Sequence, residues 1–540
     1  MTAILTLLLA GALGAAPGDS VPPLYSGLGD HHHEITTSVP QAQAYFDQGL
    51  RLTYGFNHGE AIRSFRASVA ADPTCAMCWW GVAYALGPNI NAAMDSASGV
   101  AAYEAVQEAK RLARGASPKE RAYIEALAQR YVAVPTGPRK DLDKAFADAM
   151  RVVAREYPQD DDAQVLYAES LMDLSPWVYW TDDGEPTAHG AEVQALLTQV
   201  LARNDRHAGA CHYYIHAVEA KKPELAVPCA ERLPELMPAA GHIVHMPAHI
   251  YIRVGRYADA IDRNVHAVHA DEQYIADQSP DGLYPLAYYP HNYHFLWYAA
   301  AMAGRAEQAI EAARHTADHT PREGLAHPSM GALQQYVATP YFALVRFGRW
   351  QELLAAPAPA EDVPYVQALW RYAVGVARLR TGDAPGAVKE LRVMESILAQ
   401  HPELAETYVW EGNTAQTIVR IGIGVLGAEI DAAAGDFDEA VDKLTAAVAL
   451  DDALIYDEPP SWPIAVRHNL GAVLIAAGRP VDAERVYRED LAEYPLNGWS
   501  LFGLSQALRA QGRTTDAARV ERDLQKAWAT ADVRLTSSRF

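Results

Sequence analysis

The sequence predicts an all-α protein built as an array of antiparallel helical hairpins, and three observations support this. From about residue 40 onward apolar residues recur with the helical period, and the alternation typical of β-strands is scarce. Glycine turns interrupt these segments, and Arg or Asp follows each of these glycines. Two steps between turns are 34 residues long, which is the length of a helix–turn–helix repeat. The turn glycines are Gly255, Gly304, Gly348, Gly382, Gly435, Gly478 and Gly512.

Two stretches carry the small, aromatic and proline landmarks of such a repeat. They run Gly49-x2-Leu52, Ala61-x3-Phe65, Pro73 and Leu470-Gly471-x2-Leu474, Ala483-x3-Tyr487, Pro495. Small residues let the two helices of a hairpin approach, the aromatic fills the gap between repeats, and the proline stops the second helix. The chain therefore resembles the tetratricopeptide repeat (TPR) family over most of residues 40–530. The resemblance implies a TPR-like α-solenoid, a superhelix of about nine or ten hairpins.

Further blocks resemble a bacterial, exported group of TPR proteins, and this resemblance implies no particular activity. They are Tyr45-Phe-Asp-Gln-Gly-Leu50, His212-Tyr-Tyr-Ile-His216 and His245-Met-Pro-Ala-His249-Ile.

The N-terminus is typical of a secretory signal. Residues 1–16 are apolar and end in small residues, although no Lys or Arg precedes the apolar run. We expect a signal peptide at 1–16, export to the periplasm or the medium, and an extended segment at 17–40; an N-terminal helix is the alternative. The Pro-rich stretch Ala355–Pro364 is the best linker, and it separates a TPR-like solenoid at 41–354 with a His-rich groove from a second one at 365–535.

Composition excludes several classes of function. The 45 basic and 67 acidic residues give a formal net charge of −22 without a cluster of cations, so we expect no nucleic-acid partner. After signal removal no segment is apolar and long enough to span a membrane. The chain has no Gly-rich phosphate loop, so no nucleotide is expected. Cys75 and Cys78 lack the His that follows a c-type haem site, so no haem is expected; the two could instead form a disulfide, bind metal or be redox-active.

Two histidine pairs repeat in step along the chain. His212 and His216 lie four residues apart, and His245 and His249 follow with the same spacing 33 residues later. Four residues are about one helical turn, so each pair shares a helix face. Because the offset is close to the repeat length, imidazoles from neighbouring helices are expected to face the same region.

The resemblance to TPR solenoids also places ligand-facing positions. In TPR solenoids, positions 2, 5 and 9 of the inner helix generally meet the ligand. When two repeats of this chain are aligned on their turn glycines, these positions are occupied mostly by histidines. Neighbouring helices pack about 8–10 Å apart, so imidazoles from both sides could converge on zinc, copper or iron. In the two repeats these positions hold His242, His245, His249 and His291, His294, Tyr298.

Acidic and phenolic residues nearby could complete the site. Glu219, Asp173 and Tyr213 are candidates to fix imidazole tautomers, and Glu169 is a candidate ligand or general base. The expected metal ligands are His212, His216, His245 and His249, with His291 or His294 completing the set, while His242, Tyr213, Tyr298 and Asp173 are expected in the ligand groove.

Two function classes remain open. An exported TPR scaffold would bind a peptide, a protein segment or a small ligand in the His-rich groove, with or without a transition metal. A metal-dependent enzyme would use the same histidines as ligands and Glu169 as the proton carrier, with lids at 175–190 and 274–290. The run His31-His32-His33 could bind metal, but composition favours a solvated stretch.

Overall fold

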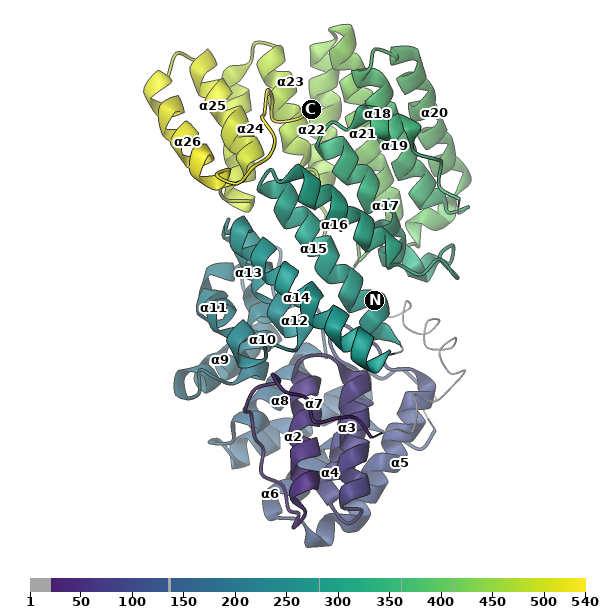
Figure 1. Ribbon diagram of the computed structural model, residues 1–540, viewed down its shortest axis with the longest axis vertical. Helices are drawn as coiled ribbons and strands as arrows, with labels where there is room; N and C mark the ends of the chain where they lie inside the picture. Colours follow the sequence, from purple (N-terminus) through teal and green to yellow (C-terminus); the bar gives the residue numbers. More distant parts are fainter. Residues whose placement is uncertain (1–20, 135–136, 281, 361, 411) are drawn as a thin grey trace. The chain divides into compact units, whose positions relative to one another are not determined.

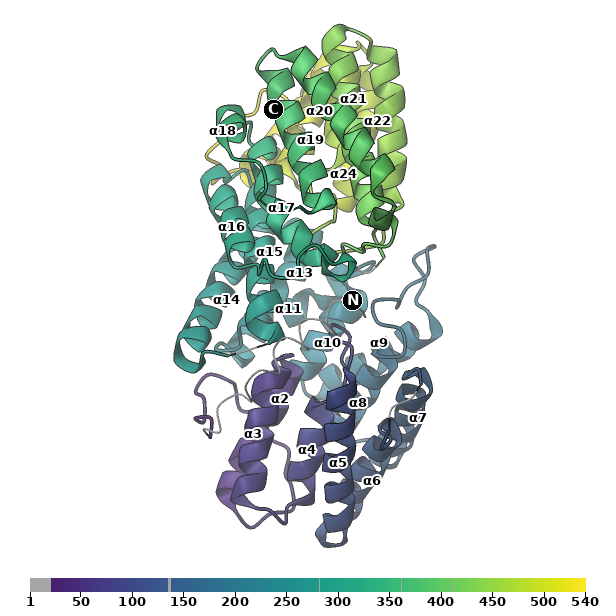
Figure 2. The ribbon, with the colours of Figure 1, turned by 90° about the vertical axis from the view of Figure 1, so that its right-hand side faces the viewer.

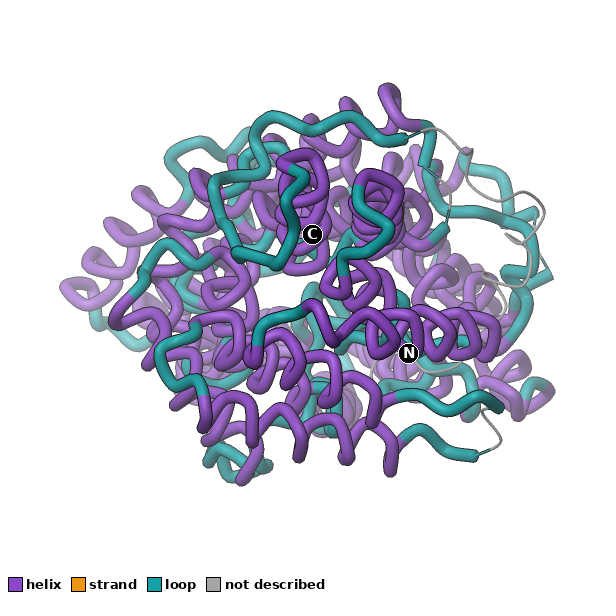
Figure 3. The backbone as a smooth tube through the Cα atoms, turned by 90° about the horizontal axis from the view of Figure 1, so that it is seen from below, coloured by secondary structure: helices purple, strands orange, loops and turns teal. Residues whose placement is uncertain are grey.

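The described part of the chain is α-helical. The computed structural model describes residues 21–540 except 135–136, 281, 361 and 411, so the expected signal peptide lies outside the described residues. Over these residues the only β-pairing is three isolated bridges, and Figure 3 shows helices and loops without strands. The prediction of an all-α fold is confirmed.

The chain forms two compact units. The first comprises Met1–Ile250 and Val265–Tyr289, and the second comprises Tyr251–Asn264 and Pro290–Phe540. The division therefore runs through helices α13, α14 and α15. The Pro-rich stretch Ala355–Pro364 lies inside the second unit, between α18 and α19.

The helices of each unit pair in sequence order into hairpins (Figure 1). The first unit contains α2 (Pro40–Tyr54), α3 (His58–Ala71), α4 (Ala76–Ala85), α5 (Ser96–Leu112), α6 (Pro118–Leu127), α7 (Lys140–Glu156), α8 (Asp161–Met172), α9 (Ala188–Arg203), α10 (Ala208–Val218), α11 (Val227–Leu236), α12 (Gly241–His245), most of α13 (Pro247–Arg253) and of α14 (Tyr257–Gln278), and a π-helical segment (Tyr284–Tyr288).

The second unit continues the same pattern. It contains α15 (Tyr289–Met302) apart from its first residue, and then α16 (Ala306–Asp318), α17 (Gly331–Arg346), α18 (Trp350–Ala355), α19 (Pro364–Arg380), α20 (Ala384–Gln400), α21 (Ala415–Ala434), α22 (Phe437–Asp452), α23 (Val466–Ala476), α24 (Pro480–Glu493), α25 (Gly498–Ala510) and α26 (Thr514–Ala527).

Alternate helices also contact one another, as they do in a TPR solenoid. Besides its hairpin partner α3, helix α2 contacts α4, and helix α19 contacts both α20 and α21 (Figure 2). The aromatic landmarks Phe65 and Tyr487 each sit between two glycines. A Cβ atom at Gly49 or Gly81 would lie 2.7 or 2.2 Å from the Phe65 ring, so only glycine lets the helices close on it. Each unit is therefore a stack of TPR-like hairpins.

The turn glycines behave as the sequence predicts. All seven have a positive φ, between 64° and 91°, a conformation that glycine adopts without the penalty of a Cβ atom. None of the described helices has the length and apolar character needed to cross a membrane.

Candidate metal centre

Three imidazoles of the first unit converge on one point. His212 and His216 project from one face of α10, and His242 projects from α12. The Nε2 atom of His212 lies 3.1 Å from Nε2 of His216 and 3.2 Å from Nε2 of His242. All three side chains are at most 2% exposed. The structure thus brings together three of the histidines that the sequence singled out.

Hydrogen bonds on the far side of two rings fix their tautomers. Nδ1 of His212 donates to the backbone carbonyl of Tyr54 at 2.6 Å, and a carbonyl can only accept. Nδ1 of His216 donates to Oε1 of Glu219 at 3.1 Å. The neutral rings therefore carry their protons on Nδ1 and present bare lone pairs on Nε2.

The two lone pairs face each other at 3.1 Å, an arrangement that a cation between them would stabilise. A tetrahedral metal with bonds of about 2.0–2.1 Å holds its ligand nitrogens roughly 3.3 Å apart. The distances of 3.1 and 3.2 Å fit this value. A proton fits less well. Burial lowers the pKa of His212 well below its ordinary value, and His216 lowers it further. Burial also lowers the pKa of His216.

A single carboxylate supports two of the imidazoles. Burial alone would raise the pKa of Glu219, but attraction by His249 and His216 lowers it overall. Its second oxygen, Oε2, lies 2.8 Å from Nδ1 of His249, whose Nε2 lies 2.9 Å from Nε2 of His245. Carboxylates that orient ligating imidazoles in this way are common around protein-bound metals.

The second histidine pair lies on two helices rather than one. His242 and His245 belong to α12, whereas His249 belongs to α13. The helix breaks at Met246 because Pro247 has no N–H to donate. Met246 still has right-handed helical angles, so the rings stay near the expected face.

Aromatic rings enclose the cluster, and two of them come from strained positions. The Phe56 ring stacks on His216 and His242 with ring centroids 6.0 and 5.5 Å apart. The Trp177 ring packs edge-on against His216 at 5.0 Å. Phe56 and Trp177 have φ values of 56° and 65°, in the left-handed region that non-glycine residues rarely adopt. Such strain persists where the surroundings require it, and functional sites are the usual place.

Glu169 and Asp173 belong to a different buried network. Asp173 pairs with Arg130 at 2.5 Å, and Glu169 accepts a hydrogen bond from Tyr84. Burial raises the pKa of both carboxyl groups. Neither is among the groups of residues spaced to hold a metal in the described part of the chain. Tyr213 packs against His212 with ring centroids 5.3 Å apart.

Three predicted residues lie in the second unit, all on α15. Nδ1 of His291 lies 3.2 Å from the Tyr336 hydroxyl. Burial lowers the pKa of His294 to about 3. Burial also raises the pKa of Tyr298 well above its ordinary value.

A second histidine cluster includes His31 and His33, which belong to the run that composition predicts to be exposed to solvent. Residues 21–39, the N-terminal strap, have neither helix nor strand and bond to the first unit, as where Tyr45 donates to the carbonyl of Pro22. His31 Nε2 and His33 Nδ1 lie 2.9 and 2.6 Å from the two oxygens of Asp162. Both rings are largely buried, so the expectation of a solvated stretch is wrong. The carboxylate of Asp162 explains the difference, because it compensates the burial of the imidazoles.

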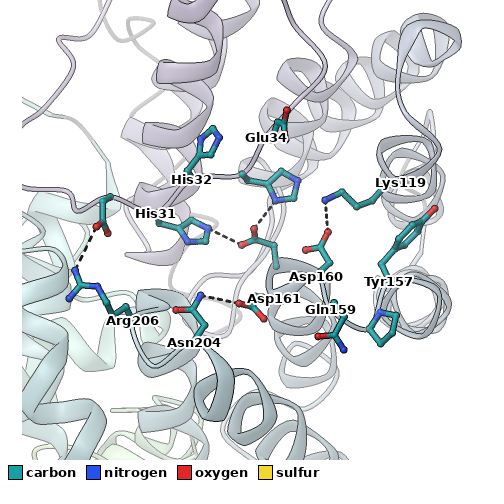
Figure 4. Close-up of a pocket in the computed structure, with 14 residues that line it drawn as sticks. His31, His32, Glu34, Lys119, Tyr157, Gln159, Asp160, Asp161, Asn204 and Arg206 are labelled. Atoms are coloured by element: carbon teal, nitrogen blue, oxygen red, sulfur yellow. Dashed lines mark hydrogen bonds and ion pairs between the residues drawn. The ribbon is translucent and has the colours of Figure 1, made fainter.

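The strap cluster borders a pocket of about 730 Å³ (Figure 4). Lys119 pairs with Asp160 at 2.8 Å on one side of it, and Asn204 donates to Asp161 at 2.9 Å on the other.

Hydrogen bonds account for the contacts that Asp162 makes in the strap cluster. Nδ1 of His207 accepts from the backbone N–H of Ala210, so its Nε2 carries a proton toward Asp162, 3.3 Å away. Tyr54 also donates its hydroxyl to Asp162, at 2.5 Å. Every neighbour of this carboxylate can be a donor, and no lone pairs oppose each other there. This separates the strap cluster from the cluster around His212.

We expect the strap to be held more tightly at about pH 5.5 than at about pH 8. Burial lowers the pKa of His31 and His33, but Asp162 outweighs it and raises both pKa values above normal. The resulting stability is complete below the unfolded-state pKa and is lost as pH rises through the folded-state pKa. Burial tends to raise the pKa of Asp162, but the imidazoles hold it well below its ordinary value, so it stays ionised throughout.

Hydrogen exchange of residues 21–39 at the two pH values, corrected for the intrinsic rate, measures this effect. Weaker protection at the lower pH would contradict it.

Cys75 and Cys78 form a disulfide with Cα atoms 5.4 Å apart. Of the alternatives that the sequence left open, pairing is confirmed. The bond lies at the start of α4, where Cys75 is the N-cap.

Comparisons with known proteins return helical-repeat structures at low similarity. No family model matches the sequence, and no curated protein matches it. The human IFIT1 dimer with m7Gppp-AAAA is 11% identical over 84% of this chain and 90% of that chain, with a TM-score of 0.35. The APC/C hetero-tetramer Cut9–Hcn1 is 11% identical over 91% and 74%, with a TM-score of 0.30. Naa15/Naa10 bound to HypK-THB is 12% identical over 90% and 71%, with a TM-score of 0.24. At these identities and TM-scores, the likenesses say nothing about what this protein binds.

Proposed function

We propose that this protein binds a transition-metal ion in its first unit through His212, His216 and His242. The observation that carries the proposal is the pair of Nε2 lone pairs, fixed by Tyr54 and Glu219, that face each other at 3.1 Å in a buried site. Buried polar atoms in such an arrangement need a partner, and a metal ion supplies it.

The ligand set favours copper and a centre with an open position. Neutral imidazoles suit zinc, copper, iron and nickel, and among divalent ions copper binds such donors most tightly. Sites with three protein ligands keep a fourth position for water or substrate, whereas structural zinc sites use four. We therefore propose a metal-dependent TPR-like protein that takes a small ligand at the metal, and the helical scaffold supplies the rigid support.

The export expected from residues 1–16 belongs to this proposal. The disulfide between Cys75 and Cys78 supports it, because such bonds persist mainly in oxidising compartments.

Metal loading tests the proposal. Protein purified without a polyhistidine tag, stripped with chelator and incubated with copper(II) is expected to retain copper after desalting. The electron paramagnetic resonance (EPR) spectrum of that copper is expected to show coupling to imidazole nitrogen. Parallel loading with zinc and iron(II) ranks the metals. A protein that releases all three ions on desalting would leave only the peptide-binding or protein-binding scaffold.

A further inference from the structure

A line of four tyrosine rings leads away from the proposed metal ligand His242. The Tyr288 ring packs edge-on against His242 with centroids 4.8 Å apart. Tyr284 follows at 5.5 Å, Tyr274 at a further 5.6 Å and Tyr25 at a further 6.4 Å. Rings at these separations are in van der Waals contact at their edges.

Three of the four hydroxyl groups donate to a carboxylate. Tyr284 donates to Oδ1 of Asp271 at 2.8 Å, while Tyr25 and Tyr274 donate to the two oxygens of Glu60 at 2.8 and 3.1 Å. Tyrosine can lose an electron reversibly when a neighbouring base takes its phenolic proton. The fourth hydroxyl, that of Tyr288, accepts from the Asn91 amide at 3.3 Å instead.

The line is also joined to the metal ligand through the backbone. The N–H of His242 donates to the Tyr284 hydroxyl at 3.2 Å. The Tyr284 hydroxyl itself donates to Asp271, so this carboxylate is already in place to take the proton that oxidation of the phenol releases.

The outer end of the line opens on a cavity of about 430 Å³. Tyr25, Tyr274, Tyr284 and Asp271 all line it. Tyr25 and Tyr274 are partly exposed, whereas Tyr284 and Tyr288 are buried. A small molecule in this cavity would meet Tyr25, Tyr274 and Tyr284, whereas none of the three clustered histidines lines the cavity.

We propose that these tyrosines conduct single electrons from a small phenolic donor in the cavity to the metal held by His212, His216 and His242. The inference rests on the proposed function, because the electron needs a redox-active metal as its acceptor.

The steps balance in electrons and protons. With a redox-active metal held by His212, His216 and His242, one electron from Tyr284 would pass to it through the Tyr288 ring and His242, and the Tyr284 proton would move to Asp271. Tyr274 then reduces the Tyr284 radical, Asp271 returns the proton, and the Tyr274 proton moves to Glu60. The donor restores Tyr274, directly or through Tyr25, with one electron, while Glu60 returns the proton. Overall the donor loses one electron and releases one proton to water.

Stopped-flow reduction of the copper(II)-loaded protein by hydroquinone without oxygen tests the route. Tyr284→Phe is expected to slow the loss of the copper(II) EPR signal by about tenfold or more. Tyr274→Phe is expected to slow the reduction of copper(II) as well, although the Tyr274 hydroxyl donates to Glu60 and does not contact a metal ligand. Asp271→Asn should slow it and remove the solvent deuterium isotope effect seen in the wild type. Tyr123→Phe is the control, because Tyr123 is a buried tyrosine of the same unit that lies off the line.

Copper content and the starting EPR spectrum of each variant separate the possible failures. A wild type that retains none of copper, zinc and iron overturns both proposals, and one that retains only zinc overturns the electron route alone. Variants that hold copper with the wild-type spectrum and are reduced at the wild-type rate overturn the electron route alone.

Discussion

The His212→Ala variant is expected to lose the bound metal ion. The Nε2 atom of His212 lies within 3.2 Å of both partner nitrogens, so its removal leaves only two of the three proposed ligands. Metal content after loading and desalting measures the loss. Glu219→Gln tests the support of the ligands instead, and it is expected to weaken metal binding by about 10–100-fold in a chelator competition.

Matched variants separate metal loss from misfolding. His468→Ala removes a fully buried histidine of the second unit that pairs with Asp490, so it perturbs packing without touching the cluster. Glu169→Gln changes another buried glutamate of the first unit, one that bonds Tyr84 rather than an imidazole. Both are expected to keep the metal. If Glu169→Gln lost it, Glu169 would regain the role of ligand that the sequence left open for it.

The Asp162→Asn variant is expected to destabilise the first unit by about 3–5 kcal/mol, as loss of one partner of a buried charge pair does. Asp162 is fully buried and neighbours three imidazoles and the Tyr54 hydroxyl. An amide offers one acceptor oxygen in place of two and turns an N–H group toward existing donors. Since the chain has two units, hydrogen exchange within α2 and α8 is a better measure than a single melting temperature.

The neighbouring residue provides the control. Asp161 pairs with Arg203 and Asn204 while partly exposed, so Asp161→Asn is expected to cost less than about 1 kcal/mol. Equal losses of protection in the two variants would contradict a special role for the buried carboxylate.

Periodicity predicted the fold well because the hairpins are made by local rules. The glycine turns need only their own φ angle, and the landmark Phe65 needs only the glycines of adjacent helices. The same rules placed His212, His216 and the second histidine pair on facing surfaces. They also directed attention to Glu219, which lies three residues after His216.

Partners that are distant in the sequence could not be predicted in this way. The acceptor that fixes His212 is a backbone carbonyl 158 residues away, and any residue type could supply it. Phe56 and Trp177 reach the cluster through left-handed backbone that their types do not favour. His31 and His33 meet Asp162 across about 130 residues, so composition alone suggested solvent for them. A usable signal was the row of acidic residues Asp160–Asp162 at a helix start.

Tyr54 has a further consequence. Its carbonyl oxygen holds His212, and its hydroxyl belongs to the Asp162 cluster. Both clusters therefore contact the last turn of α2. A small displacement of that turn would change contacts in each cluster. If docking of the strap changes the affinity for the metal ion by some factor, binding of the ion must change the docking equilibrium of the strap by the same factor. One tyrosine thus acts as a mechanical coupling between the beginning of the chain and its histidines.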